Sequence, residues 1–161
     1  MNHDSYSDAY IGGILRDTRR IAMVGASPNW NRPSFFAMKY LQSKGYRVIP
    51  VNPAAAGQEI LGEPVYATLA DIPEPVDMVD IFRNSEAAAA IVDAAIACGA
   101  RTVWMQLGVR NDAAAARAEA AGLRVVMNRC PKIEYGRLTG ALSWGGINSG
   151  VISSRRRRAI V

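Results

Sequence analysis

The stretch CGARTVWMQLG, residues 98–108, contains the pattern that decides the fold. A glycine ends an alanine-rich segment, and an uninterrupted apolar run follows it. The same pattern occurs in KGYRVIPV at 44–51 and in AGLRVVM at 121–127. Glycine readily adopts the left-handed conformation that ends a helix, and continuous apolar runs are typical of strands buried on both faces of a parallel sheet. The repeat predicts an α/β fold, a doubly wound, Rossmann-like parallel sheet with helices on both faces.

Outward from these repeats, the apolar runs and the turn residues predict the remaining elements. The predicted strands cover residues 20–24, 47–51, 78–82, 102–107 and 124–127, with a short strand near Val65 and Tyr66. The predicted helices cover about 10–17, 34–44, 85–98 and 112–121, and a last helix begins near 131. Pro50 lies late in its strand and has no N–H group, so we expect sheet pairing to stop there.

The chain has 161 residues, of which 50% are hydrophobic, which suits one domain with a sizeable core. We expect a single domain over 1–142, including the N-terminal helix, and a basic, mobile tail over 143–161. The net charge is +5, and Arg155 to Arg158 supply four positive charges. The domain itself is therefore nearly neutral, and nucleic acid is not an expected partner.

Several classes of protein are disfavoured by simple absences from the sequence. No apolar run approaches the ~20 residues that span a bilayer, and the first ten residues carry acids where a signal peptide needs basic residues. We therefore expect a cytoplasmic protein with no membrane partner. His3 is the single histidine, and Cys98 and Cys130 form no CxxC motif. This composition disfavours catalytic triads, zinc sites and disulfide frameworks. Cys130 follows a predicted strand, but without a nearby histidine a catalytic thiol is the minor interpretation.

In open parallel sheets, ligands bind beyond the carboxyl ends of the strands, where the strand order reverses. The first such segment is GASPNWNRPS, residues 25–34, which leads from a strand into a helix. Backbone amides at the helix start and the hydroxyls of Ser27 and Ser34 can hold a phosphate, and Arg32 can add a charged contact. Only Gly25 of a GxGxxG fingerprint is in place, so an ordinary turn is the alternative.

The other strand ends carry weaker signals. A typical NAD site has an acid after the second strand, and Asn52 stands there instead, which argues against an NAD dehydrogenase. Arg83 follows the third strand, where it either faces a ligand or pairs with an acid such as Asp80. Gly108 follows the fourth strand and either allows a ligand close to the backbone or simply ends the strand with a turn.

Taken in order, these segments resemble the family of stand-alone coenzyme A-binding domains, relatives of the N-terminal domain of the succinyl-CoA synthetase α-subunit. The resemblance covers roughly residues 10–140 and is carried by the ordered set rather than by any single motif. The matching segments are VGAS (24–27) with RPS (32–34), VIPVNP (48–53), ILG (60–62) with PVY (64–66) and Leu69, VDIFR (79–83), WMQLGV (104–109) and MNRC (127–130).

The resemblance implies that the protein binds CoA, or an acyl-CoA, through its nucleotide end. The implied binding positions are Gly25, Ala26, Ser27, Val51, Asn52, Pro53, Phe82, Arg83, Gln106, Leu107 and Gly108, and we add Arg32, Pro33 and Ser34 from the first loop. No second domain and no second histidine are present, so the ligase chemistry of the synthetase is not implied. The synthetase has a lysine shortly after the proline that ends its second strand, and Ala54 and Ala55 stand there in this sequence, so Arg32 or Arg83 must supply the charge.

Two other functions remain open from the sequence. One is an enzyme that uses NAD(P) or another nucleotide, and the other is a structural or partner-binding α/β protein with a vestigial site. Asn52 counts against the first, and the positions of Arg32 and Arg83 count against the second. The sequence carries no signal for the acyl group or for the oligomeric state.

Overall fold

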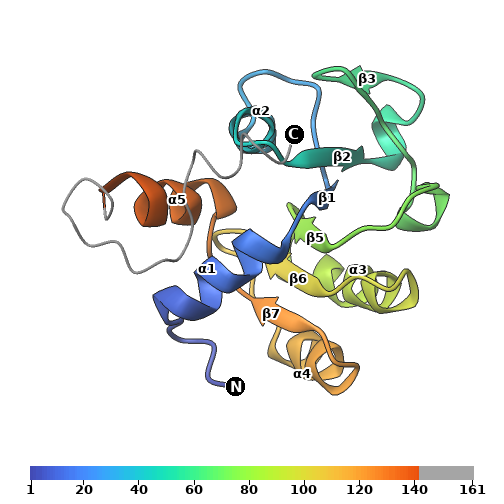
Figure 1. Ribbon diagram of the computed structural model, residues 1–161. Helices are drawn as coiled ribbons and strands as arrows, with labels where there is room; N and C mark the ends of the chain where they lie inside the picture. The colour runs from blue at the N-terminus through green and yellow to red at the C-terminus, as the bar shows by residue number, and fades with distance from the viewer. Residues whose placement is uncertain (142–161) are drawn as a thin grey trace.

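The computed structural model describes residues 1–141, which form a five-stranded parallel sheet between two layers of helices (Figure 1). The strand order is β2-β1-β5-β6-β7, and every neighbouring pair is parallel. The strands are β1 (Arg20–Val24), β2 (Arg47–Val51), β5 (Met78–Ile81), β6 (Thr102–Met105) and β7 (Arg124–Val126). The predicted parallel α/β sheet is confirmed.

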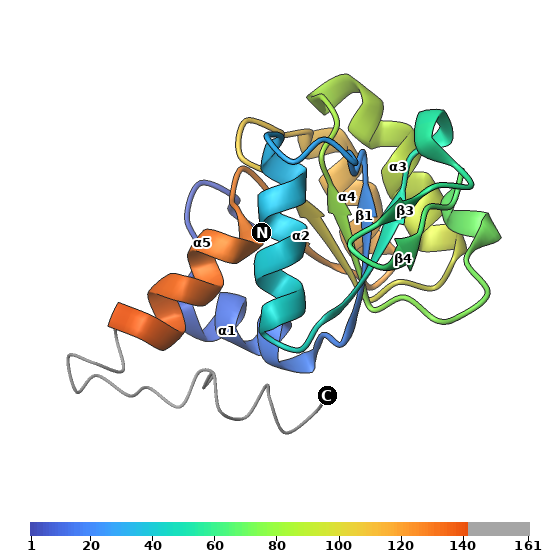
Figure 2. The same ribbon diagram turned by 90° about the horizontal axis from the view of Figure 1, so that it is seen from above.

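Helices cover both faces of the sheet, as Figure 2 shows from above. One face carries α1 (Asp8–Asp17), α2 (Pro33–Ser43) and α5 (Pro131–Gly136), which a π-helical segment (Arg137–Ala141) extends; the other carries α3 (Ser85–Ala97) and α4 (Asp112–Ala120). Alternate strand residues enter two separate apolar cores. Met23 and Trp104 lie in the first core, whereas Ala22 and Val103 lie in the second. Burial on both faces explains why the strands are continuous apolar runs.

The chain between β2 and β5 makes short elements outside the main sheet. These are 3-10 turns at Pro53–Ala55 and Leu69–Asp71 and a two-stranded antiparallel ribbon of β3 (Glu59–Ile60) and β4 (Glu63–Pro64). The expectation that sheet pairing stops at Pro50 is wrong. Pro50 pairs in register with Met23, and its carbonyl faces outward, accepting from Tyr66 N–H at 3.0 Å. Because β2 is an edge strand here, the missing N–H of Pro50 costs no bond to β1.

Three strands end one or two residues earlier than the apolar runs predict. Phe82, Gln106 and Met127 follow the last residues of β5, β6 and β7. Gln106 and Met127 are still buried, so the run of buried residues continues for one position after the strand itself has ended. These residues lie at the carboxyl edge of the sheet, where the predicted ligand contacts are.

The N-terminal segment is hydrogen-bonded to the end and edge of β7. Helix α1 begins at Asp8, two residues earlier than predicted, because Ser7 Oγ accepts from Tyr10 N–H at 3.1 Å and caps it. The Tyr10 hydroxyl accepts from Val125 N–H and donates to Val125 C=O, at 3.0 and 2.9 Å. The Tyr6 hydroxyl accepts from Met127 N–H at 2.9 Å. Two tyrosines thus cover the open edge of β7, whose backbone groups have no further strand as partner.

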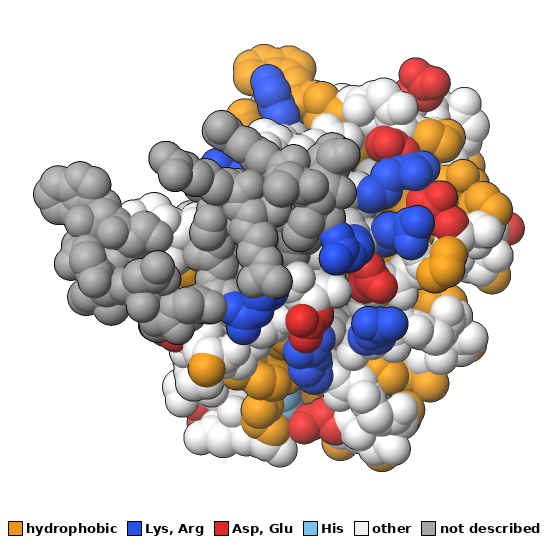
Figure 3. Space-filling model, in the orientation of Figure 1, with side chains coloured by type: hydrophobic (Ala, Val, Ile, Leu, Met, Phe, Trp, Pro, Cys, Tyr) orange, Lys and Arg blue, Asp and Glu red, His pale blue; other side chains and the backbone are white. Residues whose placement is uncertain are grey.

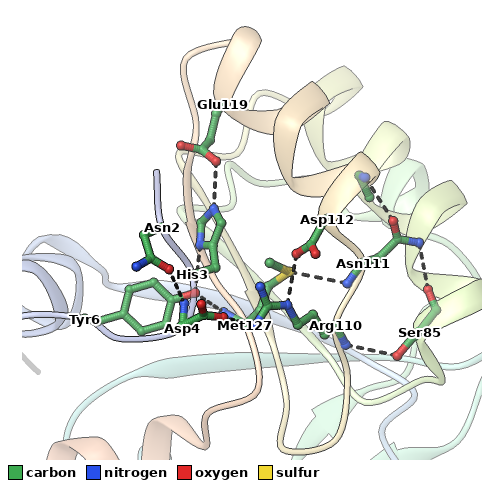
Figure 4. A network of polar contacts seen from close by, with 11 residues as sticks. Asn2, His3, Asp4, Tyr6, Ser85, Arg110, Asn111, Asp112, Glu119 and Met127 are labelled. Carbon is green, nitrogen blue, oxygen red and sulfur yellow. Dashed lines mark hydrogen bonds and ion pairs between the residues drawn. The ribbon is translucent and has the colours of Figure 1, made fainter.

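The single histidine belongs to this same N-terminal segment (Figure 4). His3 is buried, and its ring bonds to Glu119 Oε1 at 2.7 Å and to the Tyr6 hydroxyl at 2.8 Å. No helix within residues 1–141 is long and apolar enough to cross a membrane. The tail predicted at 143–161 lies outside the described residues.

Candidate functional site

The strand order reverses between β1 and β5, which are neighbours in the sheet. The chain passes from β1 to β2 on one side and then returns to β5 on the other side of β1. The loops that leave β1 and β5 therefore diverge at their carboxyl ends. Such a divergence is where open α/β sheets bind their ligands.

Backbone hydrogen bonds join the three strand ends at this point. Gly25 N–H donates to Val51 C=O at 2.9 Å, and Phe82 N–H donates to Val24 C=O at 2.8 Å. Gly25 has φ +90°, and a Cβ atom there would lie 2.5 Å from the Phe82 carbonyl oxygen and 3.0 Å from Arg83 Cδ. Glycine is thus required by close packing of two backbones as well as by the positive φ. The Arg83 side chain therefore packs beside Gly25 at the start of the first loop.

The predicted phosphate loop is held by its own side chains. Ser34, which is buried, accepts from Ser27 N–H at 3.1 Å, and Ser27 Oγ accepts from Asn29 N–H at 3.1 Å. Ala26 C=O accepts from Asn52 Nδ2 at 2.9 Å, which ties the loop to the end of β2. The Ser27 amide is therefore engaged inside the loop. Each serine hydroxyl accepts one bond and keeps its own hydrogen for an incoming oxygen.

The residues at the end of β2, Val51, Asn52 and Pro53, carry no charge. Both polar atoms of the Asn52 side chain are hydrogen-bonded, since Nδ2 donates to Ala26 C=O and Oδ1 accepts from Ala54 N–H at 3.0 Å. Val51 is buried, and Pro53 is exposed at the start of a 3-10 turn. Asn52 thus fixes the loop where a typical NAD site places a ribose-binding acid.

Arg32 and Arg83, which lie at the first loop and after β5, have no acidic partner among residues 1–141. Most other arginines are paired: Arg47 contacts Glu63 and Glu74, and Arg110 contacts Asp4 and Asp112. Basic and acidic side chains are likewise interspersed on the face in Figure 3. Arg32 and Arg83 are exposed as well, but neither forms an ion pair with a described residue. The alternative that Arg83 pairs with Asp80 is not observed, because Asp80 is completely buried and neither of its oxygens has a hydrogen-bond partner in the described chain.

A cavity of about 710 Å³ adjoins the first loop. Its lining residues come from the start of α2, the loops after β5 and β6, and the start of α5. The cavity-lining residues are Asn31, Pro33, Phe36, Ala37, Phe82, Arg83, Asn84, Gln106, Leu107, Val109, Cys130, Lys132 and Ile133. Its charged lining residues, Arg83 and Lys132, are both positive. A largely apolar lining with two cationic side chains suits an amphipathic anion.

The structure brings most of the predicted residues together at one edge. Pro33, Phe82, Arg83, Gln106 and Leu107 line the cavity. The predicted residues Gly25, Ala26, Ser27, Ser34, Val51, Asn52 and Pro53 form or brace the adjoining loops of β1 and β2, with Arg32 directly before α2. Gly108 has φ +81°, and its N–H donates to Asn128 Oδ1 at 2.7 Å, so it makes a turn at the rim of the site.

The cavity wall formed by α2 and α5 was not predicted from the sequence. Phe36 and Ile133 are about half exposed, at 49% and 53%, on the first turns of these helices. Both helices begin at a proline, Pro33 and Pro131, directly after a strand-end loop. An exposed apolar residue two or three positions after such a proline was the available signal. Among the described residues, no cluster of His, Cys, Asp and Glu could hold a metal ion.

An open parallel sheet with two helical layers and a glycine loop at its switch point defines a Rossmann-like α/β domain. Within this class, the family model for the CoA binding domain matches residues 19–136. The protein therefore belongs to the CoA-binding domain family. The matched span lies within the 10–140 of the resemblance seen in the sequence.

Similar proteins share nearly the whole domain. The uncharacterized protein YneT of Bacillus subtilis (strain 168) is 35% identical over 129 residues, which cover 80% of this chain and 94% of YneT. The crystal structure of Prb, the PH1109 protein redesigned for binding, has 40% identity and a TM-score of 0.80, over 84% of this chain and 94% of Prb. Cell-free ID.343 from Thermus thermophilus has 36% identity and a TM-score of 0.78, over 82% of this chain and 98% of that one.

Proposed function

We propose that this protein binds CoA or an acyl-CoA at the switch point, with the nucleotide end at the loops of β1 and β2. The observation that carries the proposal is the pair of exposed arginines, Arg32 and Arg83, beside a loop whose glycine packs against the Phe82 carbonyl. Membership of the CoA-binding domain family supports the same ligand.

CoA matches the chemistry of this edge part by part. Its pyrophosphate suits the serine hydroxyls of the first loop, since Ser27 and Ser34 each retain a hydrogen to donate. Its 3′-phosphate suits an arginine without an acidic partner, such as Arg83. Its adenine fits the end of β2, where Asn52 and Pro53 present a surface without charge. The uncharged pantetheine arm then has the neighbouring cavity, which is largely apolar, available to it.

We propose a binding role without ligase chemistry of its own. His3 is the single histidine of the chain and bonds to Glu119 beside β7. The cavity-lining residues therefore include no imidazole that could act as a base or carry a phosphoryl group. An enzyme that uses NAD(P) is the alternative function, and Asn52 at the ribose position disfavours it.

Thermal unfolding with matched ligands tests this proposal. A ligand that binds only the folded state raises the melting temperature, and the rise grows with the logarithm of its concentration relative to its Kd. At equal concentrations we expect the largest shift with CoA, a smaller one with 3′-dephospho-CoA, which lacks one phosphate, and the smallest with NAD. Isothermal titration calorimetry of the same ligands gives the affinities. A larger shift with NAD than with CoA contradicts the proposal and supports the alternative enzyme.

A further inference from the structure

The cavity beside the first loop contains a thiol. Cys130 lines the cavity directly before α5 and is 7% exposed. Arg83 lines the same cavity, and its Cδ lies 3.0 Å from the position that a Cβ on Gly25 would take. One side chain thus borders both the proposed nucleotide site and the cavity. A ligand held at the first loop can continue past Arg83 into the space that Cys130 lines.

A second, independent feature of this cavity indicates a ligand. Gln106 also lines it and is 8% exposed, yet its Oε1 is buried without any hydrogen-bond partner in the described chain. A buried amide oxygen without a donor costs about 1–3 kcal/mol, so the site is suited to a ligand that brings an N–H group. The pantetheine arm of CoA carries two amide N–H groups between its phosphate end and its sulfur.

We propose that the cavity takes the pantetheine arm of CoA and that Cys130 exchanges with CoA disulfide to form a mixed disulfide. This inference rests on the proposed function, because the nucleotide end must first bind at the β1 loop. Gln106 Oε1 accepts from a pantetheine amide and aligns the arm. The bound sulfur then reaches the cavity wall that Cys130 forms.

The exchange needs no further oxidant. The Cys130 thiol loses its proton to solvent, and its sulfur attacks one sulfur of CoA disulfide. The disulfide bond of the ligand breaks while the Sγ–S bond to Cys130 forms. The leaving CoA thiolate takes up a proton and departs as free CoA. The protein gains the mass of one CoA less two hydrogen atoms.

Exchange fits this cavity better than acyl transfer from an acyl-CoA to the same thiol. Acyl transfer passes through a charged tetrahedral intermediate and calls for a positioned base and oxyanion donors. The single histidine is engaged with Glu119 beside β7. Thiol–disulfide exchange requires only a thiolate that can approach one sulfur of the disulfide in line with the S–S bond.

Cys98 supplies a control within the same protein. It is an exposed free cysteine at the end of α3, on the opposite face of the sheet from α5 (Figure 2). A reagent without a binding site therefore reacts faster with exposed Cys98 than with buried Cys130. A reagent that binds the cavity reverses this order, because binding raises its effective concentration at Cys130.

The test compares two single-cysteine proteins, Cys98→Ser and Cys130→Ser. Each is incubated without reductant with CoA disulfide or with glutathione disulfide, and modification is followed by intact-mass spectrometry. With CoA disulfide we expect Cys130 to react about tenfold faster than Cys98 or more, and with glutathione disulfide we expect the reverse order. Adding 3′,5′-ADP, which competes for the nucleotide site, slows the reaction at Cys130 and leaves Cys98 unchanged.

Three results overturn the inference: faster reaction of Cys98 with CoA disulfide, equal reaction of Cys130 with both disulfides, or acylation of Cys130 by acetyl-CoA in place of exchange. Calorimetry of the Cys98→Ser protein with reduced CoA separates this inference from the proposed function. Binding of reduced CoA without exchange contradicts the inference alone. Absence of both binding and exchange contradicts the proposed function as well.

Discussion

The N-terminal segment along β7 and the loops at the carboxyl edge of the sheet differ in whether their polar side chains have partners within the protein. Along β7, polar side chains are saturated with partners inside the protein: His3 bonds to Glu119 and Tyr6 (Figure 4), and Tyr10 bonds to both backbone groups of Val125. At the carboxyl edge, Arg83 has no acid and Gln106 Oε1 has no donor within the described chain.

The polar groups along β7 stabilise the fold, whereas those at the carboxyl edge remain available to a ligand. A polar group that finds a partner on folding stabilises the protein, whereas one buried without a partner is destabilising. The N-terminal segment closes the exposed edge of a parallel sheet, which would otherwise be open to another strand. The carboxyl edge leaves donors and acceptors unmatched beside a cavity, as a site for an external ligand requires.

The largest expected effect comes from Gly25→Val. The new side chain would lie 2.5 Å from the Phe82 carbonyl oxygen, at φ +90°. We expect complete loss of CoA binding in calorimetry and a clearly lower melting temperature, because two loops that define the site must separate. Positive φ alone costs a β-branched residue about 1–3 kcal/mol.

Gly57→Val is the matched control for the backbone strain. Gly57 has φ +86°, close to that of Gly25, but a Cβ there meets no atom within 4 Å. We expect it to lower stability through the strained φ while CoA binding remains. If Gly57→Val and Gly25→Val behave alike, close packing against Phe82 is not what the site requires.

The second prediction concerns Asp80, whose carboxyl is buried in the central strand β5 without a partner in the described chain. Burial raises the pKa of Asp80 well above its ordinary 3.8. The folded protein then holds a proton that the unfolded chain releases. The carboxyl's contribution to stability is fully present below pH 3.8 and is lost as pH rises toward the raised pKa, by about 1.4 kcal/mol per pH unit.

Asp80→Asn removes this titration at nearly constant shape. We expect the variant to be more stable than the parent at neutral pH and the difference to shrink as pH falls toward 4, measured by urea unfolding across that range. An ion pair between Asp80 and Arg83 predicts the opposite sign, because a paired carboxylate stabilises more as pH rises. That outcome would show that Arg83 is not free for a ligand.

The third prediction concerns the N-terminal segment along β7 and uses the variant Tyr10→Phe. This change removes the hydroxyl that bonds to both the N–H and the C=O of Val125, so the edge of β7 loses its cover. We expect a loss of about 1–3 kcal/mol in the free energy of unfolding, with CoA affinity unchanged. Tyr40→Phe is the control, because the Tyr40 hydroxyl makes no hydrogen bond within residues 1–141, and it should change stability by less than about 0.5 kcal/mol. A large change in CoA affinity with Tyr10→Phe would mean that the two regions are coupled.

The smallest expected effect comes from Arg83→Ala. Arg83 is exposed and has no ion pair among the described residues, so its removal should leave the melting temperature of the free protein nearly unchanged. We expect CoA binding to weaken about tenfold at low salt and by less at high salt, since salt screens an exposed charge pair. Arg101→Ala, an equal charge change at the amino end of β6, is the control in the same calorimetric titrations. Equal losses of CoA affinity in both variants would show that Arg83 acts only through general electrostatic attraction of the anionic ligand.

The order of helices and strands could be predicted from the sequence because its signals are local. Gly45, Gly99 and Gly122 end helical segments, and each precedes a run of apolar residues that only a doubly covered strand can bury. The same reasoning located the strand-end loops, and with them Gly25 and Arg83. The edge position of β2 was not a local signal, and for that reason the effect of Pro50 on pairing was misjudged.

Local sequence signals thus sufficed for the α/β class, the order of the elements along the chain and the loops that follow each strand. Only the tertiary structure decided that β5 lies beside β1, which places the switch point there and presses Gly25 against Phe82. It also decided that Tyr6 and Tyr10 close the edge of β7 and that Gln106 and Cys130 share one cavity. The two kinds of information differ in how far apart along the chain the interacting residues are. Glycine caps and apolar runs act between neighbours in the chain, whereas strand order and cavities depend on how residues far apart in sequence bury one another's surface.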